Sequence, residues 1–135
     1  MLPIAAAVAV ACGVLAGCVA ATQPSSWEPG PGVTATYLGG GLSANLPAGV
    51  RVPAVVAAAD EALGSAGYVI TARDVTLDRG RVVARAADRR LSGRRVLVRA
   101  FPHGDGSRAT IRVEPGGDPA MSREIMERML TRLGL

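Results

Sequence analysis

Apolar residues recur every three or four positions in two stretches of the chain, which is the period of an amphipathic helix with one face against a core. The first stretch covers residues 52–66 and is followed by Gly67, a residue type that commonly ends a helix. The second begins at Asp118, a good N-cap, with Pro119 at the first helical position. Its apolar stripe consists of Met121, Ile125, Met129 and Leu133. We therefore expect two helices, each with a single buried stripe.

Five other segments have the features of β-strands, either an alternation of apolar and polar residues or many β-branched side chains. They are residues 42–46, 68–77, 81–87, 94–101 and 108–114. Short loops that contain Gly, Asp or Pro separate the last four segments. Loops of this length predict that these four strands pair as an antiparallel meander.

The predicted order of elements is strand, helix, four strands, helix. Because each helix has only one apolar stripe to bury, both helices are expected on the same face of one sheet. Residues 37–135 should therefore form an α+β domain with two layers, an antiparallel sheet of about five strands and two helices on one face. A chain of about 100 residues is long enough to bury one such core.

The first 17 residues have a different character. They are apolar, carry no charged side chain and end in Leu15-Ala16-Gly17, directly before Cys18. This segment resembles the signal peptide and lipobox of bacterial lipoproteins, in which a small apolar triplet precedes a cysteine that becomes acylated. The resemblance implies that residues 1–17 are removed as a signal peptide and that Cys18 attaches the chain to a membrane. The alternative is a membrane-spanning helix that continues to Ala21, but the apolar run is short for the about 20 residues that spanning requires.

Residues 18–36 are rich in Thr, Gln, Pro, Ser and Gly. Three prolines at positions 24, 29 and 31 exclude a helix, and the composition predicts a tether between the lipidated cysteine and the domain. Trp27 stands alone within this segment. We expect it to be a linker residue; docking on the domain and insertion at the lipid interface are the alternatives.

The charge balance is basic, with 15 arginines and no lysine against 11 acidic residues, a net charge of +4 and a pI of about 10.0. Such a balance is also typical of nucleic-acid-binding proteins. Aromatic residues make up only 3% of the chain, so the stacking platforms of single-strand binders are missing, and we expect no nucleic-acid partner. Both cysteines, Cys12 and Cys18, lie in the first 18 residues, which leaves the predicted domain without a disulfide.

The sequence indicates no catalytic residues, no metal site and no cofactor. His103 is the only histidine, in a glycine-rich turn, and zinc sites need three or four clustered ligands. Asp60 and Glu61 are adjacent in a predicted helix, so their side chains diverge and do not form an acid–base pair.

Arginines alternate with apolar residues in the last three predicted strands. The arginines that share one side are Arg81 and Arg85, Arg95 and Arg99, and Arg108 and Arg112. Because the helices should cover the apolar side, these arginines would lie together on the open side of the sheet. The hypothesis is that this basic face contacts an anionic envelope partner: lipid headgroups, lipopolysaccharide phosphates, peptidoglycan carboxylates or an acidic protein surface. The alternative is a solvated face without a partner, since charged open faces are common in antiparallel sheets.

Residues 37–133 resemble a family of small bacterial envelope lipoproteins whose C-terminal domain is known only as a domain of unknown function. The matching features are Leu42-Ser43-Ala44-Asn45-Leu46, Ala62-Leu63 followed by Gly67-Tyr68, Ile111-Arg112-Val113 followed by Gly117-Asp118, and Ser122 with Ile125. The resemblance implies a location in the cell envelope and an α+β fold. It supplies no activity and no catalytic residue.

Together these patterns predict a non-catalytic, membrane-anchored envelope lipoprotein with a binding or accessory role. Its expected partners are the membrane, through acyl chains on Cys18, and an anionic envelope component or protein. Val19 is not the acidic residue that is associated with inner-membrane retention, so the periplasmic side of the outer membrane is the expected location. A hydrolase of a cell-wall or lipid substrate, with an unrecognised site, is the alternative.

Overall fold

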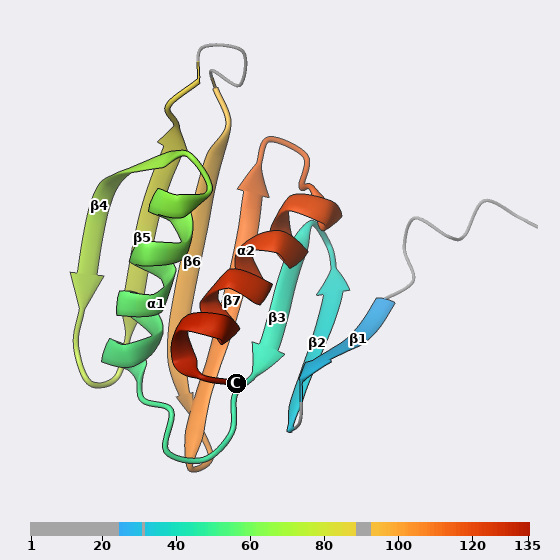
Figure 1. The fold of residues 1–135 in the computed structure, drawn as a ribbon, viewed down its shortest axis with the longest axis vertical. Coiled ribbons are helices and arrows are strands. Elements are labelled where there is room, and N and C mark those ends of the chain that lie inside the picture. Colours follow the sequence, from blue (N-terminus) through green and yellow to red (C-terminus); the bar gives the residue numbers. More distant parts are fainter. Residues whose placement is uncertain (1–24, 31, 89–92) are drawn as a thin grey trace, which may run out of the picture.

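The computed structural model describes residues 25–30, 32–88 and 93–135, and they form seven strands and two helices (Figure 1). The strands are β1 (Ser25–Gly30), β2 (Val33–Leu38), β3 (Gly41–Asn45), β4 (Tyr68–Val75), β5 (Gly80–Ala86), β6 (Arg95–His103) and β7 (Gly106–Glu114). The helices are α1 (Val52–Ser65) and α2 (Pro119–Leu133). No helix within these ranges is long and apolar enough to cross a membrane.

All seven strands belong to one antiparallel sheet with the order β1-β2-β3-β7-β6-β5-β4. Both helices lie side by side on one face of this sheet, and no described helix or strand covers the other face, which we call the open face (Figure 1). The predicted α+β class, the two layers and the meander from β4 to β7 are therefore confirmed. The pairing of β3 with β7 joins the first part of the chain to the meander.

The predicted count of five strands is wrong, because two further strands precede β3. β1 and most of β2 lie within residues 18–36, the segment for which the sequence predicted a tether. Proline excludes a strand only from the middle of a sheet and is tolerated at its edge. β1 is the edge strand, and its register with β2 shifts between Trp27 and Gly30, where Pro29 lies.

Trp27 docks on the domain rather than serving as a linker residue. Its side chain is partly buried and packs against the hydrophobic core. The guanidinium carbon of Arg123 on α2 lies 5.3 Å from the centroid of the Trp27 ring, a cation–π distance. This contact connects the edge strand to the helical layer.

The core lies between the helices and the inner face of the sheet. α1 contributes Val52, Val55, Val56, Ala58, Ala59, Ala62 and Leu63, and α2 contributes Ile125, Met126, Met129 and Leu130. Asp118 caps α2 as predicted, because its Oδ1 accepts a hydrogen bond from the Met121 N–H at 3.0 Å. Its Oδ2 accepts a second hydrogen bond from Arg94 Nη1 at 2.8 Å, which ties the start of α2 to the residue before β6.

Gly80 allows α1 to approach the sheet closely. A Cβ atom at this position would overlap Val56 Cγ2 and would lie 3.2 Å from Val52 Cγ1, both on α1. By contrast, Gly64 lies within α1 and a Cβ atom there would meet nothing within 4 Å. The two glycines therefore have opposite packing environments.

We expect Gly80→Ala to destabilise the fold by about 1–3 kcal/mol, because the added methyl group must push α1 away from β5. Gly64→Ala makes the same chemical change in open space and should stabilise the fold by up to about 1 kcal/mol through helix propensity. Urea denaturation of both variants measures the two effects. Equal shifts of the two midpoints would contradict the close packing of α1 on Gly80.

Candidate anion-binding face

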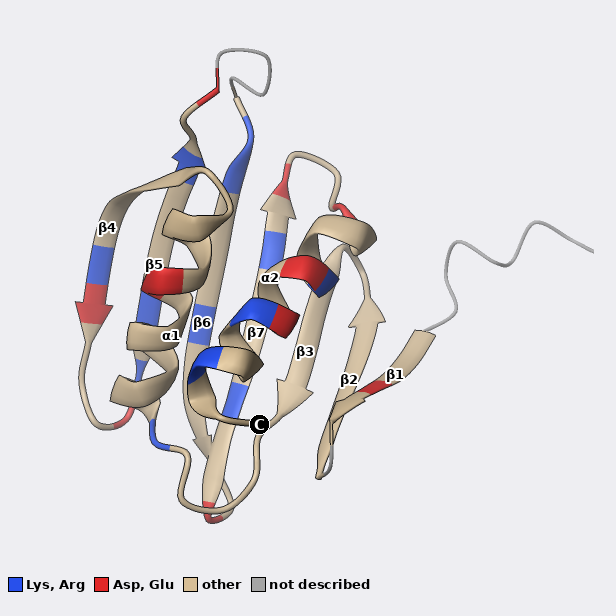
Figure 2. Ribbon diagram, in the orientation of Figure 1, with Lys and Arg blue, Asp and Glu red and all other residues tan. Residues whose placement is uncertain are grey.

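The open side of the sheet carries the six arginines that the sequence placed there. We use the name Arg face for this set: Arg81, Arg85, Arg95, Arg99, Arg108 and Arg112. All six are exposed, and their strands β5, β6 and β7 are neighbours in the sheet (Figure 2). The residues between them, such as Val82, Val98 and Ile111, are buried beneath the helices. The predicted alternation of the three strands is therefore confirmed.

The register brings like charges directly opposite each other. Arg81 pairs with Arg99, and Arg85 pairs with Arg95, across β5 and β6. Residues that are directly opposite in an antiparallel pair have Cβ atoms about 4.5–5.5 Å apart, and like charges at this spacing are destabilising. The Arg face therefore contains two repulsive pairs that the sheet has to accommodate.

A single carboxylate on the Arg face forms an ion pair. Glu114 Oε2 accepts hydrogen bonds from Arg95 Nη2 at 2.6 Å and Arg95 Nε at 3.2 Å. The hydrogen bond and the charge of Arg95 hold the pKa of Glu114 below its ordinary value, and the charges of Arg112 and Arg99 add to this effect. Within the described residues, the other five arginines of the Arg face form no ion pair and no side-chain hydrogen bond.

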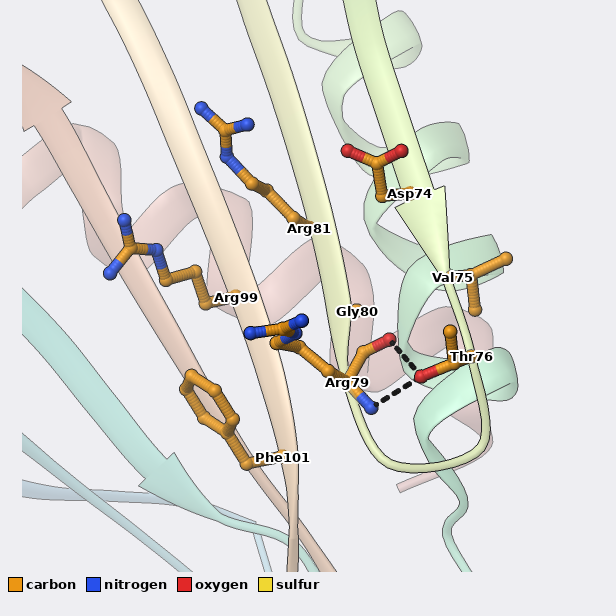
Figure 3. A pocket seen from close by; sticks show the side chains of 8 residues that line it. All are labelled: Asp74, Val75, Thr76, Arg79, Gly80, Arg81, Arg99 and Phe101. Carbon is orange, nitrogen blue, oxygen red and sulfur yellow. Dashed lines mark hydrogen bonds between the residues drawn. The ribbon is translucent and has the colours of Figure 1, made fainter.

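A seventh arginine, Arg79, lies at the edge of this face and was not among the six predicted from the sequence. It stands in the turn between β4 and β5 and lines an open hollow of about 620 Å³ with Arg81, Arg99 and Phe101 (Figure 3). The predicted strand began at Arg81, whereas the two-residue alternation continues one step further back to Arg79. That continuation is the signal that could have identified it.

The excess positive charge of the chain is concentrated here. The Arg face and Arg79 together have seven arginines against two carboxylates, Glu114 and Asp74. Asp74 is the register partner of Arg81. The surplus is five positive charges, whereas the whole chain has a net charge of +4. The remainder of the chain is therefore close to neutral, and the basic pI reflects this one surface.

Apolar side chains lie among the arginines. Val83 on β5 faces the open side, where no helix covers it, yet it is only 7% exposed. Its cover must come from neighbouring side chains on the same face, among them its register partner Leu97. Arginine stems cover apolar surface in this way while the guanidinium stays in water. Phe101, opposite Arg108, is 37% exposed.

The other residues considered for chemistry do not form a site. Asp60 forms an ion pair with Arg73, and Glu61 Oε2 lies 3.5 Å from Arg132 Nε. His103 is exposed at the end of β6, opposite Gly106. Among the described residues, no group of three or more His, Cys, Asp or Glu side chains could hold a metal ion. Leu15, Ala16, Gly17 and Cys18 lie outside the described residues.

Comparison with known proteins found no matching family model and no matching curated protein.

The ion pair of Glu114 predicts a specific pH dependence. Because folding lowers the pKa of Glu114, the ion pair stabilises the fold above the pKa of the unfolded chain. This contribution is lost as the pH falls through the folded-state pKa. Glu114→Gln should therefore melt below the wild type at pH 7, and the two melting temperatures should converge as the pH falls below the folded-state pKa of Glu114. A difference that stays unchanged over a titration from pH 7 to pH 2 would contradict the assignment to the Glu114 charge.

Proposed function

We propose that this protein is a non-catalytic, lipid-anchored envelope lipoprotein that binds an anionic partner through the Arg face. The observation that carries the proposal is the pair of opposed arginines on β5 and β6. The two directly facing like-charge pairs oppose folding, and within the described residues only two carboxylates lie beside them, Glu114 in an ion pair with Arg95 and Asp74 opposite Arg81. An anionic partner would reduce this repulsion. The electrostatic energy that destabilises the unbound fold would then favour binding.

The attachment to a membrane is proposed from the lipobox. A single acyl chain holds a protein only marginally, whereas two or more chains, at about 0.8 kcal/mol per buried methylene group, give stable attachment. Cys18 is the residue that would carry the chains, and Val19 after it favours the outer membrane.

The first strand of the sheet begins only a few residues after the proposed anchor. β1 begins at Ser25, so six residues, 19–24, separate it from Cys18. Six residues span at most about 20 Å when fully extended. A domain on so short a tether stays near the headgroups of its own membrane, which is an anionic surface in bacterial envelopes and a suitable partner for a basic face.

We expect Cys18→Ala to remain unprocessed or to lose its membrane location, because the cysteine is both the acylation site and the residue at which cleavage occurs. Cys12→Ala is the matched control, since it changes the same residue type inside the signal segment and should be processed normally. Metabolic labelling with a radioactive fatty acid and sucrose-gradient separation of the two membranes measure the outcome. Normal cleavage and unchanged fractionation of Cys18→Ala would refute the lipid anchor.

The basic face predicts salt-sensitive binding to anionic vesicles. We expect a chain without residues 1–18 to bind vesicles that contain phosphatidylglycerol at low salt and to dissociate at high salt, because screening shortens the range of exposed charges. Arg85, Arg99 and Arg112 changed together to Gln should weaken this binding at least about tenfold, at about 1 kcal/mol per charge near the surface. Since two of these residues belong to opposed pairs, the variant should melt at or above the wild-type temperature.

Arg123, Arg128 and Arg132 on α2 provide the control for net charge, because their replacement by Gln removes three positive charges from the opposite layer. Since these arginines contact Trp27, Glu124 and Glu61, the two triple variants are compared at a temperature at which both are folded. Equal weakening of binding by both triple variants would indicate a general effect of net charge. Failure of the wild type to bind at low salt would leave the Arg face as a solvated surface.

A further inference from the structure

Three arginines of the open side of the sheet line one hollow at the β4–β5 turn. Arg79 comes from the turn, Arg81 from β5 and Arg99 from β6, and Figure 3 shows their side chains around the same hollow. All three are exposed, and none forms an ion pair with a carboxylate of the described part of the chain. The hollow has a volume of about 620 Å³, which is enough for a small polar group with its substituent.

The turn that carries Arg79 is held in place by its own hydrogen bonds. The Thr76 N–H donates to the Arg79 carbonyl at 2.8 Å, and Thr76 Oγ1 accepts from the Arg79 N–H at 3.1 Å. Arg81 and Arg99 are register partners on adjacent strands. The backbone positions of all three arginines are therefore fixed by the sheet or by the turn, so binding of an anion has to order only their side chains.

The aromatic ring of Phe101 adds an apolar wall to the basic hollow. Phe101 is two residues beyond Arg99 on β6, so both side chains project from the open face. In Figure 3 the ring lies beside Arg79 and Arg99. A ligand in this hollow would thus meet positive charge on one side and apolar surface on the other.

On these observations, and resting on the proposed role of the Arg face, we propose that this hollow binds the phosphate group of a phosphate ester, with the substituent of the ester against Phe101. Guanidinium groups bind phosphate and carboxylate oxygens through paired N–H donors. A carboxylate has only two oxygens and is filled by one or two such forks. A phosphate group is tetrahedral, so its unesterified oxygens, two in a diester and three in a monoester, accept hydrogen bonds over a wider range of directions than a planar carboxylate, which suits arginines from a turn and two strands.

Asp74 gives the proposal a test of opposite sign. It lines the same hollow and, among the residues that the structure describes, forms no ion pair, although Arg81 is its register partner. Its carboxylate repels an incoming phosphate, so Asp74→Asn should bind more tightly than the wild type. Loss of the Asp74 charge would also strengthen general binding of anions to the Arg face. The test therefore has to report which arginines the ligand contacts.

The test uses the full chain in an uncharged detergent and follows the arginine Nε–Hε signals by NMR. One titration uses inorganic phosphate, a second uses short-chain phosphatidylglycerol, and a third uses short-chain phosphatidylcholine of the same chain length, whose headgroup has no net charge. We expect the first two ligands to shift Arg79, Arg81 and Arg99 more than Arg85 and Arg108. Phosphatidylglycerol should also shift the Phe101 ring, and phosphatidylcholine should bind at least about threefold more weakly.

Single substitutions locate the site. Arg99→Gln should weaken phosphatidylglycerol binding about threefold to tenfold, and Asp74→Asn should strengthen it about twofold to fivefold. Arg85→Gln removes the same charge from β5 outside the hollow and should change the affinity by less than twofold. Equal effects of Arg99→Gln and Arg85→Gln, or shifts spread evenly over all arginines, would overturn the phosphate site while leaving anion binding by the Arg face intact. Binding of inorganic phosphate without phosphatidylglycerol would overturn the ester.

Discussion

The structure depends on one constraint, which is that each helix has a single apolar stripe and the sheet has only one face that can cover it. α1 and α2 bury their stripes on the same side, and the inner face of the sheet that covers them is mainly apolar. Arg73 on β4, which pairs with Asp60 of α1, and the buried Ser107 on β7 are polar exceptions. Period-two alternation then sends every second side chain of β5, β6 and β7 to the open side. Packing constrains the composition of that side less, and in this chain half a dozen arginines lie there among a few apolar residues such as Val83, Leu97 and Phe101.

Much of this arrangement could be predicted, because α1, α2 and the meander have strong periodicity and clear turn residues. Asp118 and Pro119 mark the start of α2 in the sequence and are found in those roles. β1 could not be predicted in the same way, since Trp27 is its only large apolar residue and Pro29 argues against a strand. Its pairing depends on tertiary contacts. β1 pairs with β2 at the edge of the sheet, and Trp27 packs against the core and contacts Arg123.

The Arg face could be assigned from alternation alone, but its register could not. Alternation says which side an arginine occupies and says nothing about which residue lies opposite on the next strand. In the structure Arg81 lies opposite Arg99 and Arg85 lies opposite Arg95. This register places like charges beside each other in two pairs. The hollow also depends on register, because it combines Arg79 from a turn with residues of two strands. Local sequence carries no information about such a combination.

The width of the sheet and the reach of the residues between Cys18 and β1 limit how the proposed binding face can lie relative to the proposed anchor. β5 lies five strand positions from β1, about 24 Å at the usual spacing. A tether of about 20 Å at most, attached at the β1 edge, lets the open face lie along a membrane surface. The helical layer would then face away from the lipid, and the near-neutral remainder of the chain fits that position. The proposed acyl anchor and the basic face can act on the same surface only if both are directed toward it. Because the Arg face lies on the open side of the sheet, which the helices do not cover, the two proposals are compatible.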